Sequence, residues 1–240
     1  MHLPHLHSPI KLLHLSDLHL GDPLTVPEVV DAVQPGLAER PDLIVLTGDY
    51  VYGHGALRDH RLEDAVAALA RVAPVYAVLG NHDGGAWGGA YGDWANEPVR
   101  RRLEQGGAVV LENSKQVVTV RGQELLLVGV GDLWSQTMNP AKAFRQAPKN
   151  VPTILLAHNP DTKDQVESFD WHLLLAGHTH GNQVNLPLFD EPWATVRDHR
   201  FIAGLHAWSG RQLFINRGLG GVRGIRFNSR PELSILELAP

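Results

Sequence analysis

The 240-residue sequence contains no cysteine, which excludes a disulfide framework and any metal site built on thiolates. It also has no apolar run that approaches the roughly 20 residues of a membrane span. Residues 1–9 hold three histidines and two prolines in place of the continuous apolar stretch of a signal peptide. We expect these nine residues to form a flexible N-terminal tail and residues 10–240 to form a single domain.

Basic residues are not in excess, because 21 Lys and Arg face 26 Asp and Glu, which gives a formal charge of −5. A surface that coats DNA or RNA normally shows a basic excess, so we expect no nucleic-acid partner. The absence of cysteine suits a reducing compartment. We therefore expect a cytoplasmic protein, which could still make peripheral contact with the inner face of the membrane.

The sequence does contain short apolar runs that alternate with helical patterns over its first two-thirds, which is typical of an α/β fold. The predicted strands are residues 10–15, 43–46, 75–79, 109–111, 116–120, 124–129, 153–157, 173–176, 183–186, 211–216 and 233–238. The predicted helices are residues 26–40, 62–72 and 96–105, with a short helix after Pro160. The pattern predicts an α/β fold with a two-sheet β-sandwich flanked by helices.

Five polar clusters each come just after a predicted strand. They are Asp17-Leu18-His19, Gly48-Asp49, Gly80-Asn81-His82-Asp83, His158 and Gly177-His178-Thr179-His180. The carboxyl ends of strands are the edge at which α/β sheets bind ligands, because the strands hold the loops rigidly there. We therefore expect the five clusters to meet in one site.

The donor atoms of these clusters are two carboxylates, one amide oxygen and four imidazoles. They belong to Asp17, Asp49, Asn81, His19, His158, His178 and His180. A mixed oxygen and nitrogen set of this size exceeds the needs of one ion and indicates two metals that share a ligand.

Asp49 is the expected shared ligand, since a carboxylate has two oxygens and can bridge two ions. Asp17 and His19 are one residue apart, and in an extended segment such residues point to the same side, so we expect both to bind one ion. Two adjacent metals are typical of displacement at phosphorus, which predicts the hydrolysis of a phosphate ester.

The ordered set of five motifs resembles the calcineurin-like metallophosphoesterase family, over about residues 10–238. Residues 181–183, 217–220 and 230–232 are similar to the small bacterial phosphodiesterases of the YaeI and YkuE type. The resemblance implies a metallophosphoesterase-like, four-layer α/β/β/α arrangement and the hydrolysis of a phosphodiester or phosphoanhydride bond. A related branch, the UDP-2,3-diacylglucosamine pyrophosphatases that act on lipid A precursors, supplies the alternative function.

The resemblance also implies two divalent metal ions per chain, for which Mn²⁺, Fe or Zn²⁺ suit the donor set. It implies one ion held by Asp17, His19, Asp49 and His180, and the other by Asp49, Asn81, His158 and His178. A metal-bound hydroxide between the ions would then attack phosphorus in line.

In this scheme His82 would stabilise charge on the phosphate or protonate the leaving oxygen, and Asp83 would orient the His82 ring.

The sequence departs from the family at one point. Many members carry a second acid three residues after the bridging aspartate, where this chain has Tyr52.

Four further residues are candidates for substrate binding. Arg217, Arg223 and Arg226 could bind a phosphate through their guanidinium groups or equally form surface salt bridges. His54 follows the bridging aspartate closely and could contact the substrate. His14, which alternates with leucines, is expected to be a packed or hydrogen-bonded core residue.

The expected substrate is a small-molecule or lipid-linked phosphoester. The loop of residues 84–94 carries three aromatic residues that could cover this substrate, contact an acyl chain or membrane, or simply pack against the domain. Two other classes of function stay open. One is a non-catalytic scaffold, which the complete donor set argues against, and the other is a nuclease, which the acidic charge argues against.

Overall fold

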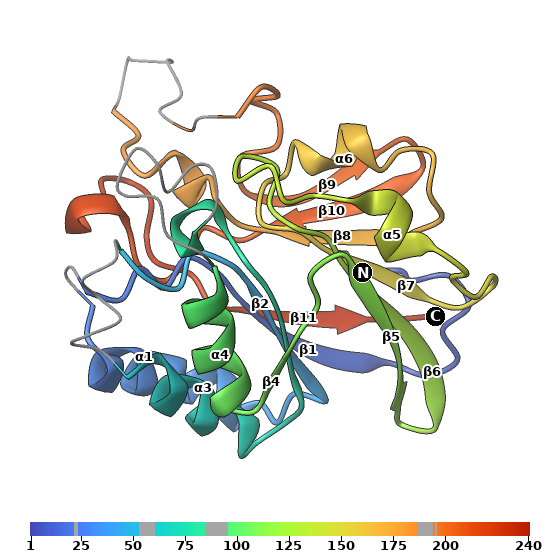
Figure 1. The fold of residues 1–240 in the computed structure, drawn as a ribbon, viewed down its shortest axis with the longest axis horizontal. Coiled ribbons are helices and arrows are strands. Elements are labelled where there is room, and N and C mark those ends of the chain that lie inside the picture. Colours follow the sequence, from blue (N-terminus) through green and yellow to red (C-terminus); the bar gives the residue numbers. More distant parts are fainter. Residues whose placement is uncertain (22–23, 53–60, 85–95, 187–193, 195) are drawn as a thin grey trace.

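The computed structural model describes residues 1–240 with the exception of 22–23, 53–60, 85–95, 187–193 and 195. Two β-sheets pack face to face, with helices on both outer sides (Figure 1). The predicted α/β sandwich of two sheets flanked by helices is therefore confirmed. One sheet has the strand order β11-β1-β2-β3-β4 and the other β5-β6-β7-β8-β10-β9.

The first sheet is parallel except at one edge. Its strands are β1 (Ile10–Leu15), β2 (Leu43–Thr47), β3 (Val75–Val78), β4 (Ala108–Val110) and β11 (Ser234–Leu238). β11 runs antiparallel to β1, and the other pairs are parallel. The helices α1 (Val26–Ala38), α3 (Leu62–Ala70) and α4 (Glu97–Gln105) connect the parallel strands. This connectivity brings the carboxyl ends of β1, β2 and β3 to the same edge.

The second sheet is mixed. Its strands are β5 (Ser114–Val120), β6 (Gln123–Gly129), β7 (Thr153–Leu156), β8 (Leu173–Ala176), β9 (Gly204–Trp208) and β10 (Arg211–Ile215), and its helices are α5 (Pro140–Phe144) and α6 (Thr162–Gln165). β5 and β6 form a hairpin whose turn residues Arg121 and Gly122 have φ of 50° and 77°. Two positive φ angles in the turn match the right-handed twist of the strands.

Alternate side chains of each buried strand enter different layers. In β1, Leu12 packs between the sheets, whereas Leu13 packs against the helices of the first sheet. In β6, Leu127 packs between the sheets, whereas Leu126 lies on the outer face with α5. Both faces of each sheet are covered, so the buried strands are apolar on both sides. The core therefore has three layers: one between the sheets and one on the outer face of each sheet.

The start of α1 is fixed by local sequence. The Thr25 backbone N–H donates to Glu28 Oε2 at 2.8 Å, which is one half of a capping box. Pro27 lies in the first turn, where its missing N–H costs nothing. The helix therefore begins where the sequence predicts, and it ends two residues earlier than predicted.

Residues 1–9 are docked, in contrast to the flexible tail expected from the sequence. Leu3 and Leu6 are buried in the core between the sheets. The terminal amine of Met1 donates to the carbonyl of Glu237 at 2.6 Å, and the Leu3 N–H donates to Ala239. The two leucines dock because they pack in the core between the sheets, while the backbone beside them bonds to the C-terminal residues. The polar residues around these leucines hide this apolar contribution in the sequence.

Three local assignments also differ from prediction. Residues 183–186 do not form a strand, since only Val184 makes a bridge, to Phe227. β9 and α5 were not predicted. β9 is an edge strand with one partner and alternating half-buried residues, and α5 is one short turn of helix, so both lack strong apolar patterns. Among the described residues, no helix combines the length and apolar character needed to cross a bilayer.

Candidate metal centre

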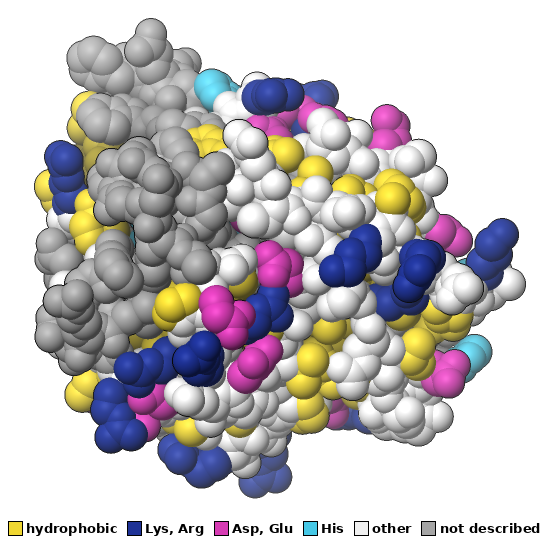
Figure 2. All heavy atoms as spheres, viewed as in Figure 1, with side chains coloured by type: hydrophobic (Ala, Val, Ile, Leu, Met, Phe, Trp, Pro, Cys, Tyr) yellow, Lys and Arg dark blue, Asp and Glu magenta, His cyan; other side chains and the backbone are white. Residues whose placement is uncertain are grey.

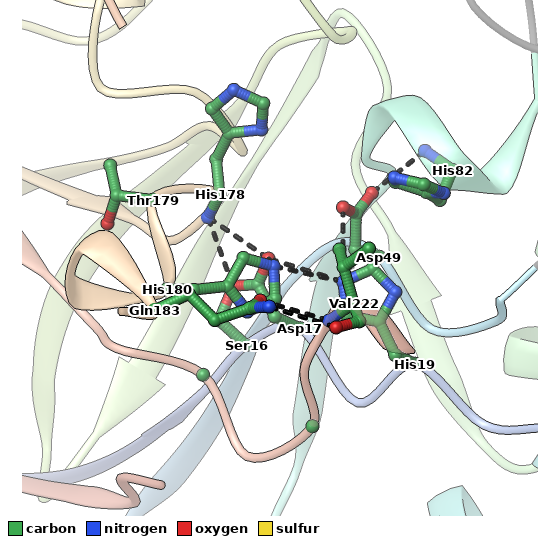
Figure 3. Close-up of polar contacts among 12 residues, drawn as sticks. Ser16, Asp17, His19, Asp49, His82, His178, Thr179, His180, Gln183 and Val222 are labelled. Carbon is green, nitrogen blue, oxygen red and sulfur yellow. Dashed lines mark hydrogen bonds and ion pairs between the residues drawn. The ribbon is translucent and has the colours of Figure 1, made fainter. Parts of the chain in front are cut away.

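The five polar clusters meet at one edge of the sandwich, as the sequence predicts. Asp17, His19, Asp49 and Asn81 come from loops that follow β1, β2 and β3 of the first sheet, and His158, His178 and His180 follow β7 and β8 of the second. All seven side chains are buried. Figure 3 shows His19 and His180 side by side, with Asp17 and Asp49 close to them.

The first group of donors is Asp17, His19, Asp49 and His180, whose ligand atoms all lie within 4.8 Å of one another. The Nε2 atoms of His19 and His180 are 3.1 Å apart. His180 Nε2 is 3.5 Å from Asp17 Oδ1, and His19 Nε2 is 3.6 Å from Asp49 Oδ2. Two nitrogens and two carboxylates therefore converge on one point.

The second group is Asp49, His158 and His178, again with ligand atoms within 4.8 Å. His158 Nε2 lies 3.2 Å from Asp49 Oδ2 and 3.1 Å from His178 Nδ1. The amide oxygen of Asn81 joins this group at 3.1 Å from His158 Nε2. Asp49 Oδ2 thus faces His19 on one side and His158 on the other, so one oxygen belongs to both groups.

His158 gives the clearest test of whether these residues fit a metal. Its Nδ1 lies 2.7 Å from the carbonyl oxygen of Thr47 and must donate its proton there. In the neutral ring Nε2 then carries a lone pair, yet it faces three further acceptor atoms, from Asn81, His178 and Asp49. A cation resolves this arrangement, and a ring whose other N–H bonds a carbonyl is the usual state of a metal ligand.

The acid–base properties of the rings agree with this fit. Burial lowers the pKa of His19 and of His178 well below the ordinary value, so both rings are neutral and have a free lone pair. Burial alone would also lower the pKa of His158, but the Asp49 carboxylate raises it well above the ordinary value. A divalent cation can replace that proton, because it supplies the positive charge that Asp49 attracts.

Most of the donor residues have left-handed backbone conformations, which non-glycine residues rarely adopt. Five of the seven have positive φ, namely Asp17 (51°), His19 (45°), Asp49 (55°), His178 (72°) and His180 (51°). Each such residue costs on the order of 1 kcal/mol, and this strain is typical of functional sites. The strained loops are held by backbone hydrogen bonds from Asp17 N to Gly48 O and from His19 N to Asp49 O.

These φ angles correct one step of the sequence argument. Asp17 and His19 do not belong to an extended segment, since β1 ends at Leu15 and both residues are left-handed. Their side chains converge because the loop turns after the strand. The two residues do lie in one group of donor atoms, so the prediction that both bind one ion stays open, but the extended geometry predicted for them was wrong.

Gly48 is required by the close approach of the loops. Its φ is 95°, and a Cβ atom at this position would lie 2.6 Å from the backbone nitrogen of Gly80 and 2.8 Å from His158 Nδ1. Both distances are shorter than real side chains tolerate. A glycine before Asp49 therefore lets the β2 and β3 loops meet the His158 ring.

The hydrogen bonds described for Asp83 are with the backbone, and its role in orienting the His82 ring stays a prediction. Its carboxylate accepts three backbone N–H groups, from Gly80 at 2.7 Å and from Asp49 and Tyr50 at 2.8 Å each. Burial and the Asp49 charge raise the pKa of Asp83 to about 8, while the Gly80 and Tyr50 amides oppose the rise. Asp83 therefore fixes the backbone that carries Asp49 and Asn81.

His82 lies at the mouth of the site, beside the shared carboxylate. Its backbone N–H donates to Asp49 Oδ1 at 2.9 Å (Figure 3). Its half-buried ring packs edge-on to His19, with ring centres 5.0 Å apart, and is stacked near Tyr52 at 5.9 Å. Tyr52, at the position where many members of the family that the sequence resembles carry a second acid, is thus an aromatic neighbour of His82.

A pocket of about 510 Å³ opens over the donor groups. Its lining includes Asp49, Asn81, His82, His178 and His180, together with Tyr52, Trp134, Val184, Val222, Arg223 and Ile225. Sequence reasoning missed Trp134, which follows β6 and whose indole is nearly perpendicular to the His178 ring, with ring centres 4.5 Å apart. Its position after a strand of the second sheet is the one signal that could have revealed it.

The three candidate arginines have different environments. Arg223 is exposed, has a φ of 57° and lines the pocket. Arg217 pairs with Glu232 at 2.6 Å and does not line this pocket. Arg226 donates to carbonyl oxygens, including those of Gly220 and His180.

The predicted phosphate role therefore suits Arg223 alone. Arg226 instead ties the chain around Gly220 to the loop that carries His180, because its donors are occupied by main-chain oxygens.

The remaining candidates for substrate contact are His54 and the aromatic loop. His54 lies outside the described residues, as do residues 85–94 of the aromatic loop. The prediction for His14 is confirmed, since its side chain is fully buried and its Nε2 lies 2.9 Å from Thr47 Oγ1.

The chain belongs to the calcineurin-like phosphoesterase family, whose model matches residues 10–182. It is 39% identical over 231 residues to phosphodiesterase YaeI of Escherichia coli, an alignment that covers 96% of this chain and 83% of the relative. It is 28% identical to the uncharacterized metallophosphoesterase YkuE of Bacillus subtilis, over 98% of this chain and 81% of the relative. It is 25% identical to the UDP-2,3-diacylglucosamine pyrophosphatase LpxG of Chlamydia muridarum, over 97% and 84%.

Solved structures agree on the fold. A dimetal phosphatase from Danio rerio superposes with a TM-score of 0.54 at 14% identity, covering 97% of this chain and 99% of that one. The NAD nucleotidase of Haemophilus influenzae gives a TM-score of 0.58 at 16% identity, covering 96% of this chain and 50% of that one. Together with the donor groups, the family indicates a hydrolase of phosphoesters that uses divalent metals.

Proposed function

We propose that this protein is a dinuclear-metal-dependent phosphodiesterase. The observation that carries the proposal is the position of Asp49 Oδ2, which faces His19 of one donor group and His158 of the other. A carboxylate shared by two nitrogen-rich groups suits two adjacent divalent ions. The similarity to phosphodiesterase YaeI supports the choice of a diester as substrate.

The first ion would be held by Asp17, His19, Asp49 and His180, and the second by Asp49, Asn81, His158 and His178. The mixture of oxygen and nitrogen donors without sulfur suits Mn²⁺, Fe or Zn²⁺. When bound, such ions supply positive charge that polarises the phosphate and lowers the pKa of water. The chain contributes the fixed spacing of the two groups, which the buried, hydrogen-bonded loops maintain.

Two side chains on the pocket wall would act on the substrate itself. His82 is half-buried beside Asp49 and would donate a proton to the leaving oxygen or stabilise charge on the phosphate. Arg223 lines the same pocket and would bind a phosphate oxygen or a second anionic group. We assign no direct catalytic role to Asp83, because its carboxylate accepts backbone amides.

A substrate with an apolar substituent is the finer part of the proposal. The pocket that Arg223 lines is also lined by Trp134, Val222 and Ile225, and Ile225 is 62% exposed. An exposed apolar residue in a pocket that polar side chains also line suits an amphiphilic phosphoester. The pyrophosphatase LpxG, a relative at 25% identity, makes hydrolysis of a lipid-linked phosphoanhydride the second candidate function.

Hydrolysis of nucleic acid is not part of the proposal. On the face shown in Figure 2, basic side chains are interspersed with acidic ones. The negative formal charge argues in the same direction. A cytoplasmic location and a single domain over residues 10–240 stay predictions, and the core that both sheets share supports the latter.

The test is a substrate panel with the purified full chain. It would compare bis-p-nitrophenyl phosphate, p-nitrophenyl phosphate and UDP-2,3-diacylglucosamine, each with Mn²⁺ and with EDTA. We expect Mn²⁺-dependent hydrolysis of the diester above the monoester, abolished by EDTA. Preference for the nucleotide-linked lipid would favour the second candidate. Failure to cleave any of the three with Mn²⁺, Fe²⁺ or Zn²⁺ would overturn the proposal.

A further inference from the structure

His178 has one ring nitrogen that the donor groups do not use. Its Nδ1 faces His158 Nε2 at 3.1 Å and so points into the second group. Its Nε2 is buried and has no hydrogen-bond partner among the described residues. A neutral imidazole that offers the lone pair of Nδ1 must carry its proton on Nε2. The ring therefore has a buried N–H group without a polar acceptor, which is rare in folded proteins.

His158, in the same group, does not share this problem. Its outer nitrogen donates to the Thr47 carbonyl at 2.7 Å, which fixes both the tautomer and the ring orientation. The two rings are otherwise comparable, because both are buried and both present a nitrogen to the same group. The difference raises the question of what holds the His178 ring.

Two aromatic rings of the described residues pack against His178: His158, which faces its Nδ1, and the indole of Trp134. The ring centres of Trp134 and His178 are 4.5 Å apart and their planes meet at 84°, which is an edge-to-face arrangement. The face of an aromatic ring carries partial negative charge and accepts N–H groups weakly. A perpendicular indole at this distance can therefore act as the missing acceptor.

Trp134 is presented to the site by a tight loop after β6. The Asp132 N–H donates to Thr137 Oγ1 at 3.0 Å, and Asp132 Oδ2 accepts the N–H of Ser135 at 2.7 Å. Ser135 Oγ donates in turn to the carbonyl of Gly84, just beyond Asp83. The loop on both sides of Trp134 is thus held by hydrogen bonds, and a positioning role requires such support.

We propose that Trp134 is a positioning residue that accepts the Nε2–H of His178 on its indole face and so directs Nδ1 toward the second metal ion. The proposal rests on the metal centre of the proposed function. It goes beyond that function by assigning the indole ring of Trp134 as the hydrogen-bond partner of His178 Nε2. Without the indole, the His178 ring can rotate or change tautomer, and the second group loses affinity while the first does not.

The test compares Trp134→Leu, which removes the aromatic face, with Trp134→Phe, which keeps one. Trp208→Leu is the matched control, because Trp208 is a half-buried tryptophan of β9 that stacks on Trp171. Binding of Zn²⁺ would be measured by chelator competition at fixed pH. We expect Trp134→Leu to weaken one of the two ions by about 10-fold to 100-fold. Trp134→Phe and Trp208→Leu should stay near the wild-type affinity.

A second readout is independent of both turnover and affinity. A proton that points at an indole face is shielded by the ring current, so the His178 Nε2–H signal of the Zn²⁺-loaded protein should lie upfield. Proton–nitrogen NMR with ¹⁵N-labelled histidine would detect it, and His178→Gln would assign it. We expect the upfield signal in wild type and in Trp134→Phe. Because this readout does not need Trp134→Leu, it tests the proposal even if that variant fails to fold.

The outcomes separate this inference from the proposed function. A wild-type chain that binds no pair of ions would overturn the metal centre itself. A wild type that binds two ions, together with unchanged affinities in Trp134→Leu or the absence of a shielded Nε2–H, would overturn the role of Trp134 alone.

Discussion

The two sheets contribute different donors to the metal centre. The first sheet supplies both carboxylates, the amide oxygen of Asn81 and the ring of His19. The second sheet supplies three imidazoles, those of His158, His178 and His180. Neither sheet holds a complete group, because each group draws on loops of both sheets.

The difference teaches that the site depends on the packing of the sandwich. The core between the sheets sets the distance from Asp49 to the second-sheet histidines. Metal binding should stabilise the folded chain in return, since the unfolded chain has no such group of donors.

The largest expected effect comes from removing the residue that both groups share. Asp49→Ala should abolish the binding of both ions and lower the rate of diester hydrolysis by at least about 1000-fold, or about 4 kcal/mol of transition-state stabilisation. Asp42→Ala, at the other end of β2, is the control and should keep both ions. Metal content and turnover would be measured together. Retention of two ions by Asp49→Ala would contradict the shared carboxylate.

The next effect separates chemistry from metal binding. His82→Ala should keep both ions but lower kcat by about 10² to 10⁴, because a proton donor is lost while the donor groups remain. Steady-state kinetics and elemental analysis would test this. If His82→Ala also lost its metals, His82 would be a structural part of the centre.

Asp83, next to His82 in the sequence, should affect stability and metal binding when it is replaced. Asp83→Ala leaves three backbone amides without their acceptor, and their loss should lower the free energy of unfolding by about 1–3 kcal/mol. It should also weaken metal binding by about 10-fold to 100-fold, since the Asp49 loop loses its support. Urea unfolding and chelator competition would measure both. Unchanged affinity with lost turnover would favour the predicted role of Asp83 in orienting the His82 ring.

The smallest expected effect is the pH dependence of stability that comes from His14, in the core between the sheets. Burial lowers the pKa of His14 to about 3, and its ring packs against Phe214 of the second sheet. The folded state disfavours the charged His14 ring, so protonation of His14 destabilises the fold. Above about pH 6.5 the ring is neutral in both states, and the free energy of unfolding carries no such penalty. As pH falls from 6.5 toward 3, the free energy of unfolding decreases by at most about 1.4 kcal/mol per pH unit from this residue.

The His14 contribution can be measured by urea unfolding in EDTA between pH 7 and pH 5. We expect His14→Gln to show a shallower loss of stability than wild type, with His206→Gln as the control. Parallel curves for wild type and His14→Gln would remove His14 from the account.

Much of the fold and of the site could be predicted from the sequence. Buried strands such as β3 and β8 are continuous apolar runs, and each donor cluster follows a largely apolar run, so their meeting at one edge follows from the parallel topology. What escaped prediction depends on contacts distant in sequence. The burial of Leu3, the amides that Asp83 accepts and the approach of Trp134 to His178 leave no local periodic signal.

The arginines illustrate the same limit. Arg217, Arg223 and Arg226 have similar positions in a glycine-rich segment, and only the fold distinguishes them. Glu232 neutralises the first and main-chain carbonyls occupy the third, while Arg223 reaches the pocket. Which guanidinium is available for a ligand depends on partners that the sequence does not reveal.

The most direct measurement is anomalous diffraction at the manganese edge from crystals of the wild-type chain grown with Mn²⁺. Two peaks are predicted, both within coordination distance of the Asp49 carboxylate, one beside His19 and His180 and the other beside His158 and His178. A single peak, or a pair in which only one ion contacts Asp49, would contradict the shared-carboxylate centre.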